Sequence, residues 1–326
     1  MAPTTTVTTT VANNDEDPFP YMRPSALGKW ESFKLEIWNP STKQFLGRTA
    51  KSWGGIVLFY LIFYAALAAF FAVCMQGLLY CLDDHSPKWQ GSQSLIGTNP
   101  GMGFRPMSRD IEQAGSLIWY TANNQTSVDY WVDILNEFSA PYYNETLKQT
   151  LMHCDYDRPI MDKKGCIVDT STWGDCRPEM GYSYNRSRPC FFIKLNKIFG
   201  WAPEFYKYDY ELPEQMPNDL KQHIKNINKT DPKQLNTIWV SCRGENPADM
   251  ETIGPVKYVS GYGLPGYYFP FKNQENYLTP VIAIQLTNAT KHVLINVECR
   301  AWAKNIIYSK VKGEREGSMH LELMMD

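Results

Sequence analysis

Four short motifs that mark common catalytic centres are absent from this chain of 326 residues. The sequence lacks a CxxC pair, an HExxH zinc motif, a GxSxG nucleophile elbow and a Walker phosphate loop, and its five histidines are scattered. These absences argue against a thiol oxidoreductase, a zinc protease, an α/β-hydrolase and a P-loop nucleotidase. We therefore expect no catalytic residue, no metal site and no cofactor, and with a net charge of −2 we expect no nucleic-acid partner.

Two short patterns do match functional motifs, and we interpret both as turns. Residues 261–266 (GYGLPG) fit GxGxxG, but Pro265 and Pro270 bracket an aromatic run where a dinucleotide site needs a helix. Asp155 and Asp157 are spaced like the metal–nucleotide carboxylate pair of Golgi glycosyltransferases. Because such a pair is common by chance, a solvated turn is the favoured interpretation. A type II lumenal glycosyltransferase remains an alternative function.

Charged side chains are absent from residues 52–82, and Gln76 is the one strongly polar residue in this run. About 20 apolar residues are enough for a helix to cross a bilayer. Some 50 residues precede the run, whereas a cleaved signal peptide starts near the first residue. The segment therefore predicts an uncleaved signal anchor, with a transmembrane helix over residues 54–82.

The flanking charges predict the orientation of this helix. Positive residues cluster before the apolar run, and a single one follows in the comparable stretch: Lys34, Lys43, Arg48 and Lys51 against Lys88. Loops rich in Lys and Arg stay in the cytoplasm. We expect a single-pass type II protein with its N-terminus in the cytoplasm and its C-terminal domain outside the cell.

The residues beyond the membrane segment carry the features of an oxidising, glycosylating compartment. All five N-glycosylation sequons lie there, at Asn124, Asn144, Asn185, Asn228 and Asn288. Six of the eight cysteines lie there too, at Cys154, Cys166, Cys176, Cys190, Cys242 and Cys299. An even number of cysteines in such a compartment indicates three disulfides, although six cysteines allow 15 connectivities. Cys74 and Cys81 lie within the apolar run.

Composition divides the chain into five segments. We expect a disordered cytoplasmic tail over residues 1–17, which have almost no large apolar side chains, and a cytoplasmic juxtamembrane segment over residues 18–53. The transmembrane helix of residues 54–82 follows. Gly, Pro and Ser are frequent in residues 83–107, which predicts an extracellular stalk, and residues 108–326 form the disulfide-bonded, glycosylated ectodomain.

Strand patterns dominate the ectodomain. A short amphipathic helix is predicted over residues 127–138, with Tyr130, Trp131, Ile134, Leu135 and Phe138 on one face. Alternating apolar residues predict strands at Ile238, Val240 and Cys242, at Ile282, Ile284 and Leu286, at Val293, Ile295, Val297 and Cys299, and at Leu321 and Leu323. Because Cys242 and Cys299 continue inward-facing sets, we expect a disulfide that ties two packed sheets together. The predicted fold is a single transmembrane helix plus a mainly-β ectodomain, an immunoglobulin-like β-sandwich with short helical additions.

The membrane segment carries an aromatic stripe at helical spacing, formed by Tyr60, Phe63, Tyr64, Leu67 and Phe71. Tyr64 lies about 15 Å deeper than Gly54 at 1.5 Å per residue, where a hydroxyl group needs a hydrogen-bond partner. Two interpretations stay open: the stripe packs on another membrane helix, or its rings face lipid.

Several residues together resemble the beta subunit of the sodium/potassium-transporting ATPase family, which is shared with the proton/potassium pump. The resemblance runs from about Phe33 to the C-terminus and is carried by Trp38-Asn39, Leu46-Gly47-Arg48-Thr49, Trp53, Phe59-Tyr60-Leu-Ile-Phe63-Tyr64, Phe104-Arg105-Pro106, Pro189-Cys190 through Asn196, and Leu286-Thr-Asn288. The chain departs from the family pattern at Glu36, Trp173, Arg177 and Pro178.

This resemblance implies a non-catalytic subunit that pairs with the ATP-hydrolysing alpha chain of a cation pump, most simply one that exchanges sodium and potassium ions. It implies help in folding and delivering the alpha chain to the plasma membrane, and modulation of transport. Disulfides are implied for Cys154 with Cys166, Cys176 with Cys190 and Cys242 with Cys299. The resemblance also implies that the aromatic stripe packs on an alpha-chain helix and that Tyr267, Tyr268 and Phe269 meet its extracellular loop.

Further expected partners are the lipid bilayer and a small single-span regulatory subunit. Besides the glycosyltransferase, a cell-adhesion protein with an immunoglobulin-like ectodomain is the remaining alternative.

Overall fold

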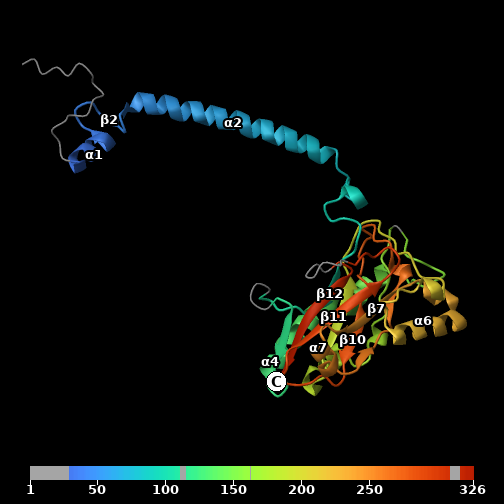
Figure 1. Cartoon of the computed structure of the whole chain (residues 1–326). Coiled ribbons are helices and arrows are strands. Elements are labelled where there is room, and N and C mark those ends of the chain that lie inside the picture. The colour runs from blue at the N-terminus through green and yellow to red at the C-terminus, as the bar shows by residue number, and fades with distance from the viewer. Residues whose placement is uncertain (1–28, 111–114, 162, 309–315) are drawn as a thin grey trace, which may run out of the picture. The chain divides into compact units, whose positions relative to one another are not determined.

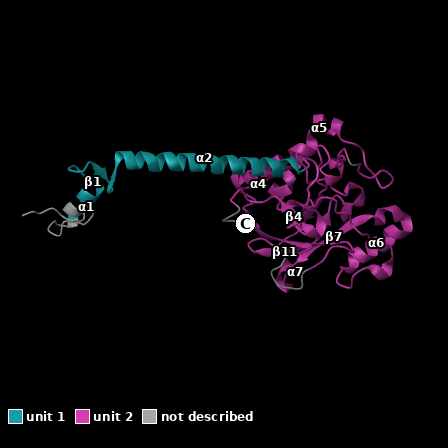
Figure 2. Cartoon of the chain, turned by 90° about the horizontal axis from the view of Figure 1, so that it is seen from above, with its two compact units in different colours: residues 1–82 teal, residues 83–326 magenta. Residues whose placement is uncertain are grey.

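The computed structural model describes residues 29–110, 115–161, 163–308 and 316–326. The predicted tail of residues 1–17 and the first part of the juxtamembrane segment, residues 18–28, lie outside the described residues. The chain divides into two compact units, Met1–Leu82 and Asp83–Asp326, which Figure 2 shows in different colours.

The first unit is built around one long helix, α2 (Ala50–Tyr80), with 31 residues and a mean hydropathy of 2.6 over its most apolar 18 residues. At 1.5 Å per residue it is about 46 Å long, which exceeds the roughly 30 Å hydrocarbon core of a bilayer. Its N-terminus is capped by Thr49, whose hydroxyl accepts a hydrogen bond from the Ser52 N–H. Among the described helices this is the one long and apolar enough to cross a membrane, and it begins at Ala50 rather than at residue 54.

A small structured segment precedes α2. Helix α1 (Lys29–Ile37) is followed by three two-residue strands in the order β1 (Trp38–Asn39), β2 (Gln44–Phe45) and β3 (Arg48–Thr49). The indole N–H of Trp53, in the first turn of α2, donates to the Phe45 carbonyl over 2.8 Å. Most of the residues before α2 that carry the family resemblance thus lie in or beside a small three-stranded sheet, which is hydrogen-bonded to the first turn of the helix.

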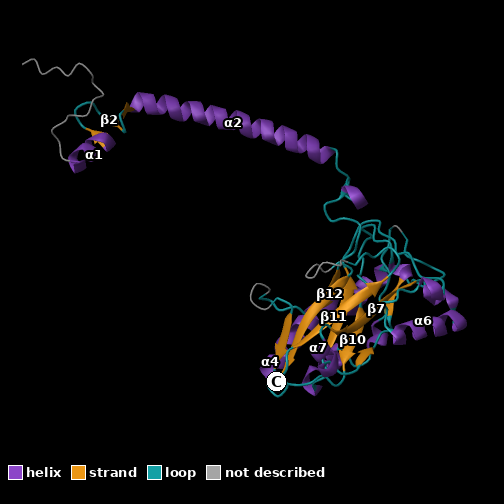
Figure 3. Ribbon diagram, viewed as in Figure 1, coloured by secondary structure: helices purple, strands orange, loops and turns teal. Residues whose placement is uncertain are grey.

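The second unit is mainly β, as predicted (Figure 3). Its four-stranded antiparallel sheet has the order β4 (Met102–Arg105), β6 (Cys190–Leu195), β10 (Ile282–Leu286), β8 (Val256–Tyr258). Its five-stranded sheet has the order β5 (Leu117–Tyr120), β12 (Ser318–Met325), β11 (Ile295–Trp302), β7 (Thr237–Gly244), β9 (Gly263–Pro265), with β5 and β12 parallel.

The helical additions are short apart from two. In the described part of this unit the α-helices are α4 (Gln125–Tyr143), α5 (Glu145–Thr150), α6 (Asn218–Thr230) and α7 (Pro247–Thr252). The 3-10 helices are η1 (Gly91–Gln93), η2 (Thr170–Trp173), η3 (Pro178–Arg186), η4 (Asp209–Glu211), η5 (Pro232–Leu235) and η6 (Gly266–Tyr268).

The core of this unit follows from the period-two alternation of its strands. Phe191 and Ile193 from one sheet and Val240 and Ala301 from the other belong to one buried apolar cluster. On the outer side of the four-stranded sheet, the Phe192 ring packs against Trp173 of η2 at 4.8 Å between ring centroids. Helical segments therefore pack on the outer face of the four-stranded sheet, and the two sheets share an apolar core.

The outer face of the five-stranded sheet is only partly covered. Trp239 and Trp302 stand opposite each other on β7 and β11 and pack against Leu220 and Ile224 of α6. Further along the same face lie charged pairs, such as Arg300 with Glu298 at 3.0 Å. The sheet thus has one apolar face and one mixed face, as is usual for antiparallel sheets.

The predicted ectodomain helix and the four predicted strands are confirmed, but their first and last residues differ from the prediction. The predicted helix over residues 127–138 is α4, and its buried face is formed by Val128, Trp131, Ile134, Leu135, Ser139 and Tyr142. Tyr130, which we placed on that face, is 36% exposed. The four predicted strands are β7, β10, β11 and β12, but Val293 precedes β11 and is exposed.

Part of the predicted stalk belongs to the β unit. Residues 102–105 form β4, whose Met102 and Phe104 are buried against β6. Only four residues make this strand, so the alternation was too short to stand out among the Gly and Pro around it.

The expected disulfide between two sheets is wrong. Cys242 and Cys299 are bonded, but they are direct neighbours on β7 and β11, within one sheet. Alternation shows only that a side chain points inward. Two inward-pointing cysteines can lie on neighbouring strands of one sheet or on strands of facing sheets, and alternation does not distinguish the two arrangements. What joins the two sheets is the shared apolar core.

The other two bridges fasten loops. Cys176 is joined to Cys190, which ties the η2–η3 segment to the start of β6, and Cys154 is joined to Cys166. The three pairs are the ones that the family resemblance implies.

Candidate interaction surfaces

The described residues bring no three His, Cys, Asp or Glu side chains together in a group able to hold a metal ion. The pair Asp155 and Asp157 forms a turn: the Asp155 carboxylate accepts the Asp157 N–H over 2.9 Å, and its backbone exchanges hydrogen bonds with Arg158. Asp157 in turn forms an ion pair with Lys233 at 2.7 Å. Its carboxylate is already engaged, so the arrangement does not favour metal-dependent sugar transfer.

Two of the glycines in residues 261–266, Gly263 and Gly266, allow a close approach between backbones. A Cβ atom on Gly263 would lie 2.5 Å from the Ile238 carbonyl oxygen, and one on Gly266 would lie 2.6 Å from that of Asn236. Edge strand β9 can therefore pair with β7 only because these positions have no side chain. The chain then makes the single 3-10 turn η6, so no helix N-terminus faces a phosphate here.

The aromatic stripe lies on α2, none of whose residues is buried within the chain. The rings of Tyr60 and Tyr64 stack at 6.0 Å between centroids, and Phe63 packs edge-on against Tyr64 at 5.4 Å. Since residues four apart lie on one face of a helix, the two hydroxyl groups project from the same side. These rings offer a preformed apolar surface with two hydroxyl groups that form no hydrogen bond with the described part of the chain.

The aromatic loop at Tyr267, Tyr268 and Phe269 is only partly at the surface. Tyr268 is 6% exposed, its hydroxyl donates to the Ile167 carbonyl over 3.1 Å, and burial raises its pKa. Tyr267 and Phe269 are half-buried, and the Phe269 ring packs against Trp201 at 5.8 Å. Tyr268 therefore holds the loop from inside, and Tyr267 and Phe269 are the rings with surface left for a partner.

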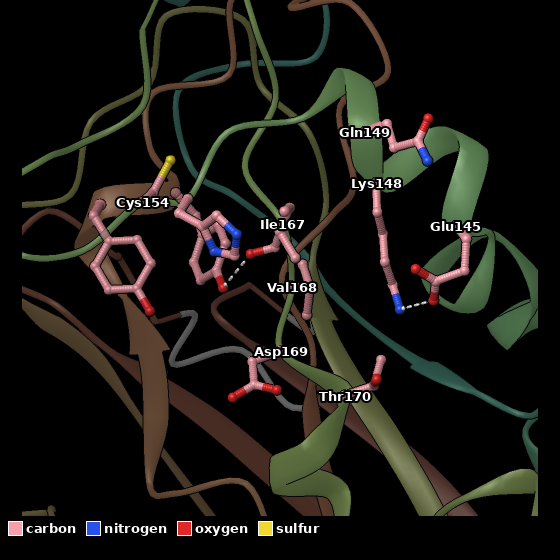
Figure 4. Close-up of a pocket in the computed structure, with 11 residues that line it drawn as sticks. Glu145, Lys148, Gln149, Cys154, Ile167, Val168, Asp169 and Thr170 are labelled. Atoms are coloured by element: carbon pink, nitrogen blue, oxygen red, sulfur yellow. Dashed lines mark hydrogen bonds and ion pairs between the residues drawn. The ribbon is translucent and has the colours of Figure 1, made fainter.

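A pocket of about 720 Å³ lies beside this loop, and sequence reasoning missed it. Figure 4 shows Lys148 and Glu145 of α5, paired at 2.8 Å, across the pocket from Asp169. Burial raises the pKa of Tyr267, which also lines the pocket, and the nearby carboxylates of Asp155 and Asp169 raise it further. The lining comes from segments more than 90 residues apart, so no local pattern could have indicated it.

Four of the five sequon asparagines are exposed, and Asn228 is half-buried. Two of them also cap helices. The Asn124 side-chain oxygen accepts the Thr126 N–H at the start of α4, and that of Asn144 accepts the Leu147 N–H at the start of α5, each over 3.1 Å. An N-linked glycan would attach to the side-chain nitrogen, which leaves the oxygen free for the cap.

Because Asn124 is both a sequon residue and a helix cap, we expect variants that lose the sequon to differ in stability according to whether they keep the cap. Thr126→Ala and Asn124→Asp abolish the glycosylation signal but keep the cap, whereas Asn124→Ala loses both. Because a lost N-cap costs about 1 kcal/mol, we expect Asn124→Ala to melt about 2 to 4 °C below Thr126→Ala. Thermal unfolding of the three full-length variants measures this difference, and equal melting temperatures would exclude a stabilising cap.

Comparison with known proteins finds one matching family model. The model described as "Sodium / potassium ATPase beta chain" matches residues 23–321. The chain is 44% identical to the sodium/potassium-transporting ATPase subunit beta-2 of Drosophila melanogaster, over 94% of this chain and 95% of that protein. It is 42% identical to subunit beta-1 of the same organism, over 91% and 94%, and 28% identical to human subunit beta-2, over 91% and 94%.

Proposed function

Because this chain belongs to the sodium/potassium ATPase beta chain family, we propose that it assembles with the ATP-hydrolysing alpha chain of a sodium/potassium pump. It is a non-catalytic beta subunit. The observation that carries this conclusion is the family match over residues 23–321, which includes both the apolar helix and the β unit. Its task is to assist folding of the alpha chain, to deliver the pump to the plasma membrane and to modulate cation transport.

The proposed topology is type II, with the N-terminus in the cytoplasm and the β unit outside the cell. The excess of Lys and Arg before α2 supports it, as do the three disulfides and five sequons that follow the helix. We propose N-glycans on Asn124, Asn144, Asn185, Asn228 and Asn288. For the β unit we propose an immunoglobulin-like sandwich, which rests on two sheets with a common core and no longer on an inter-sheet disulfide.

The proposed contacts with the alpha chain are of two kinds. In the membrane, the stripe of Tyr60, Phe63, Tyr64, Leu67 and Phe71 packs on an alpha-chain helix, because its rings are preordered and exposed and the described residues offer its hydroxyl groups no hydrogen-bond partner. Lipid covers the other faces of α2, and a small single-span regulatory subunit is a further proposed partner. Outside the membrane, Tyr267 and Phe269 meet an extracellular loop.

Co-expression tests the function directly. The alpha chain is produced in cells with this chain, without it, and with a truncated form that ends before α2. We expect surface ATPase activity and surface-labelled alpha chain to rise several-fold with the full chain, and to stay at the background level with the truncated form. If the alpha chain reaches the surface equally well in all three samples, the proposed function is wrong.

A further inference from the structure

We call the end of the β unit at which the chain enters it the membrane-proximal end, because Asp83, the first residue of this unit, directly follows Leu82 in the sequence. The first residues pack against this end rather than extending away from it. The side-chain amide of Asn273 donates to the His85 carbonyl over 3.4 Å, and residues 90–92 and 98 line a pocket of about 450 Å³ together with residues 198–202. In Figure 1 the C-terminus, α4 and α7 lie at the opposite end of the β unit.

Large apolar side chains are exposed at the membrane-proximal end. Leu95 is 108% exposed, Ile96 74% and Trp89 56%. Ile307 is far away in sequence, but its backbone is bonded to Asn99, three residues after Ile96. Asn99 donates to the Ile307 carbonyl over 2.8 Å and accepts its N–H over 2.9 Å, and the Ile307 side chain is 61% exposed. We call Trp89, Leu95, Ile96 and Ile307 the apolar tip.

A tight turn holds the two most exposed members outward. The Gly97 N–H donates to the Ser94 carbonyl over 3.1 Å, and Gly97 has a φ of +75°. The Ile96 N–H also donates to the Ser94 hydroxyl over 3.2 Å. Leu95 and Ile96 therefore occupy the centre of a turn, where polar residues or Gly and Pro are usual and two adjacent aliphatic side chains are unfavourable in water.

The chemistry around the tip matches the border between lipid and water. The Lys88 ammonium group lies 5.7 Å from the centre of the Trp89 ring. Trp and Lys are enriched where a chain leaves the bilayer, because their apolar parts contact acyl chains while their polar ends meet the headgroups. Leu95 comes only 13 residues after Leu82, so at most about 3.6 Å per residue, or about 47 Å, separates it from the end of the membrane unit.

We propose that the apolar tip inserts into the interfacial layer of the outer leaflet and gives the β unit a second, shallow membrane contact. The occupant is the lipid bilayer, because the tip is continuous with the membrane helix through residues 83–88 and combines aliphatic residues with a Lys–Trp pair. This inference rests on the proposed type II topology. It adds a contact that orients the β unit independently of the alpha chain.

Fluorescence quenching in nanodiscs of phosphatidylcholine tests the proposal. The full chain receives a single cysteine by Ile96→Cys, in a background with Cys74→Ser and Cys81→Ser, and carries an environment-sensitive dye. Ile307→Cys is a second, independent tip site. Leu294→Cys is the matched control, since Leu294 is an aliphatic residue with 45% exposure just before β11. It lies two residues after His292, whose N–H donates to the Met325 carbonyl beside the C-terminus. Each sample is measured alone and with the alpha chain, with spin-labelled lipid or with aqueous iodide as quencher.

With the chain alone, we expect spin-labelled lipid to quench the dye at residues 96 and 307 several-fold more than at residue 294, and iodide to quench it several-fold less. Equal iodide quenching at all three sites overturns the proposal. Protection from both quenchers that arises only with the alpha chain also overturns it, because the tip then binds protein. Copurification of the alpha chain is measured in parallel. A failure of assembly counts against the proposed function, whereas the quenching measured with the chain alone still tests the lipid contact.

Discussion

Replacing Tyr60 and Tyr64 together by alanine is expected to reduce the association constant with the alpha chain at least about eightfold. Hydrogen bonds between membrane helices contribute about 0.6 kcal/mol each, so two lost hydroxyl groups alone weaken association by about 1.2 kcal/mol, and the lost ring contacts add to this. The loss is incomplete because contacts made by the β unit remain. The measurement is the quantity of alpha chain that copurifies with the variant from membranes, together with the ATPase activity at the cell surface.

The chain offers a matched control on the opposite side of the same helix. Leu58 and Ile62 are also four residues apart, and each lies two residues, or about 200° of helical rotation, from one of the tyrosines. Leu58→Ala with Ile62→Ala removes apolar surface that we assign to lipid, so it should leave copurification unchanged. If both pairs reduce copurification equally, the effect comes from the helix in general and the stripe has no special role.

Removing the disulfide between Cys242 and Cys299 is expected to destabilise the β unit by about 4 kcal/mol. The bridge closes a loop with a sequence separation of 57, and by the chain-entropy model such a closure restricts the unfolded chain by this amount. A domain is typically stable by about 5 to 15 kcal/mol, so the loss is a large part of the total. Chemical unfolding of the purified full-length Cys242→Ala, Cys299→Ala double variant measures it.

The matched comparison is the Cys176→Ala, Cys190→Ala double variant. Its bridge spans a sequence separation of 14, for which the same model gives about 3 kcal/mol. Because Cys242 and Cys299 lie within one sheet, the folded fraction of the Cys242→Ala, Cys299→Ala variant should keep the packing between the sheets. Its near-ultraviolet circular dichroism should therefore be unchanged. A cost below 1 kcal/mol for the longer loop, or a loss of tertiary signal in the folded protein, would contradict this account.

Local sequence patterns predicted where strands lie but not which sheet each strand belongs to. Alternating apolar residues located β7, β10, β11 and β12, because a half-buried strand needs one apolar face whatever its neighbours are. The same alternation could not assign strands to sheets. It therefore led to an inter-sheet disulfide, while the structure pairs Cys242 with Cys299 across adjacent strands.

The candidate surfaces divide in the same way. The stripe on α2 could be found from the sequence, since its members are three or four residues apart on a regular helix. Whether Tyr268 is at the surface could not, because its burial depends on a contact with Ile167, about 100 residues earlier in the chain. Nor could the apolar tip, which acquires Ile307 through two hydrogen bonds to Asn99.

The sequence by itself determined the long apolar helix, the side of the membrane expected for each part, the number of cysteines after the helix and the family resemblance. Each of these is set by local composition, by spacing along one chain segment or by a match of residue identities. Only the tertiary structure decided which strands share a sheet, which aromatic rings stay exposed and which distant residues meet at the membrane-proximal end. These depend on contacts between segments far apart in the chain, whose relative positions no local period specifies.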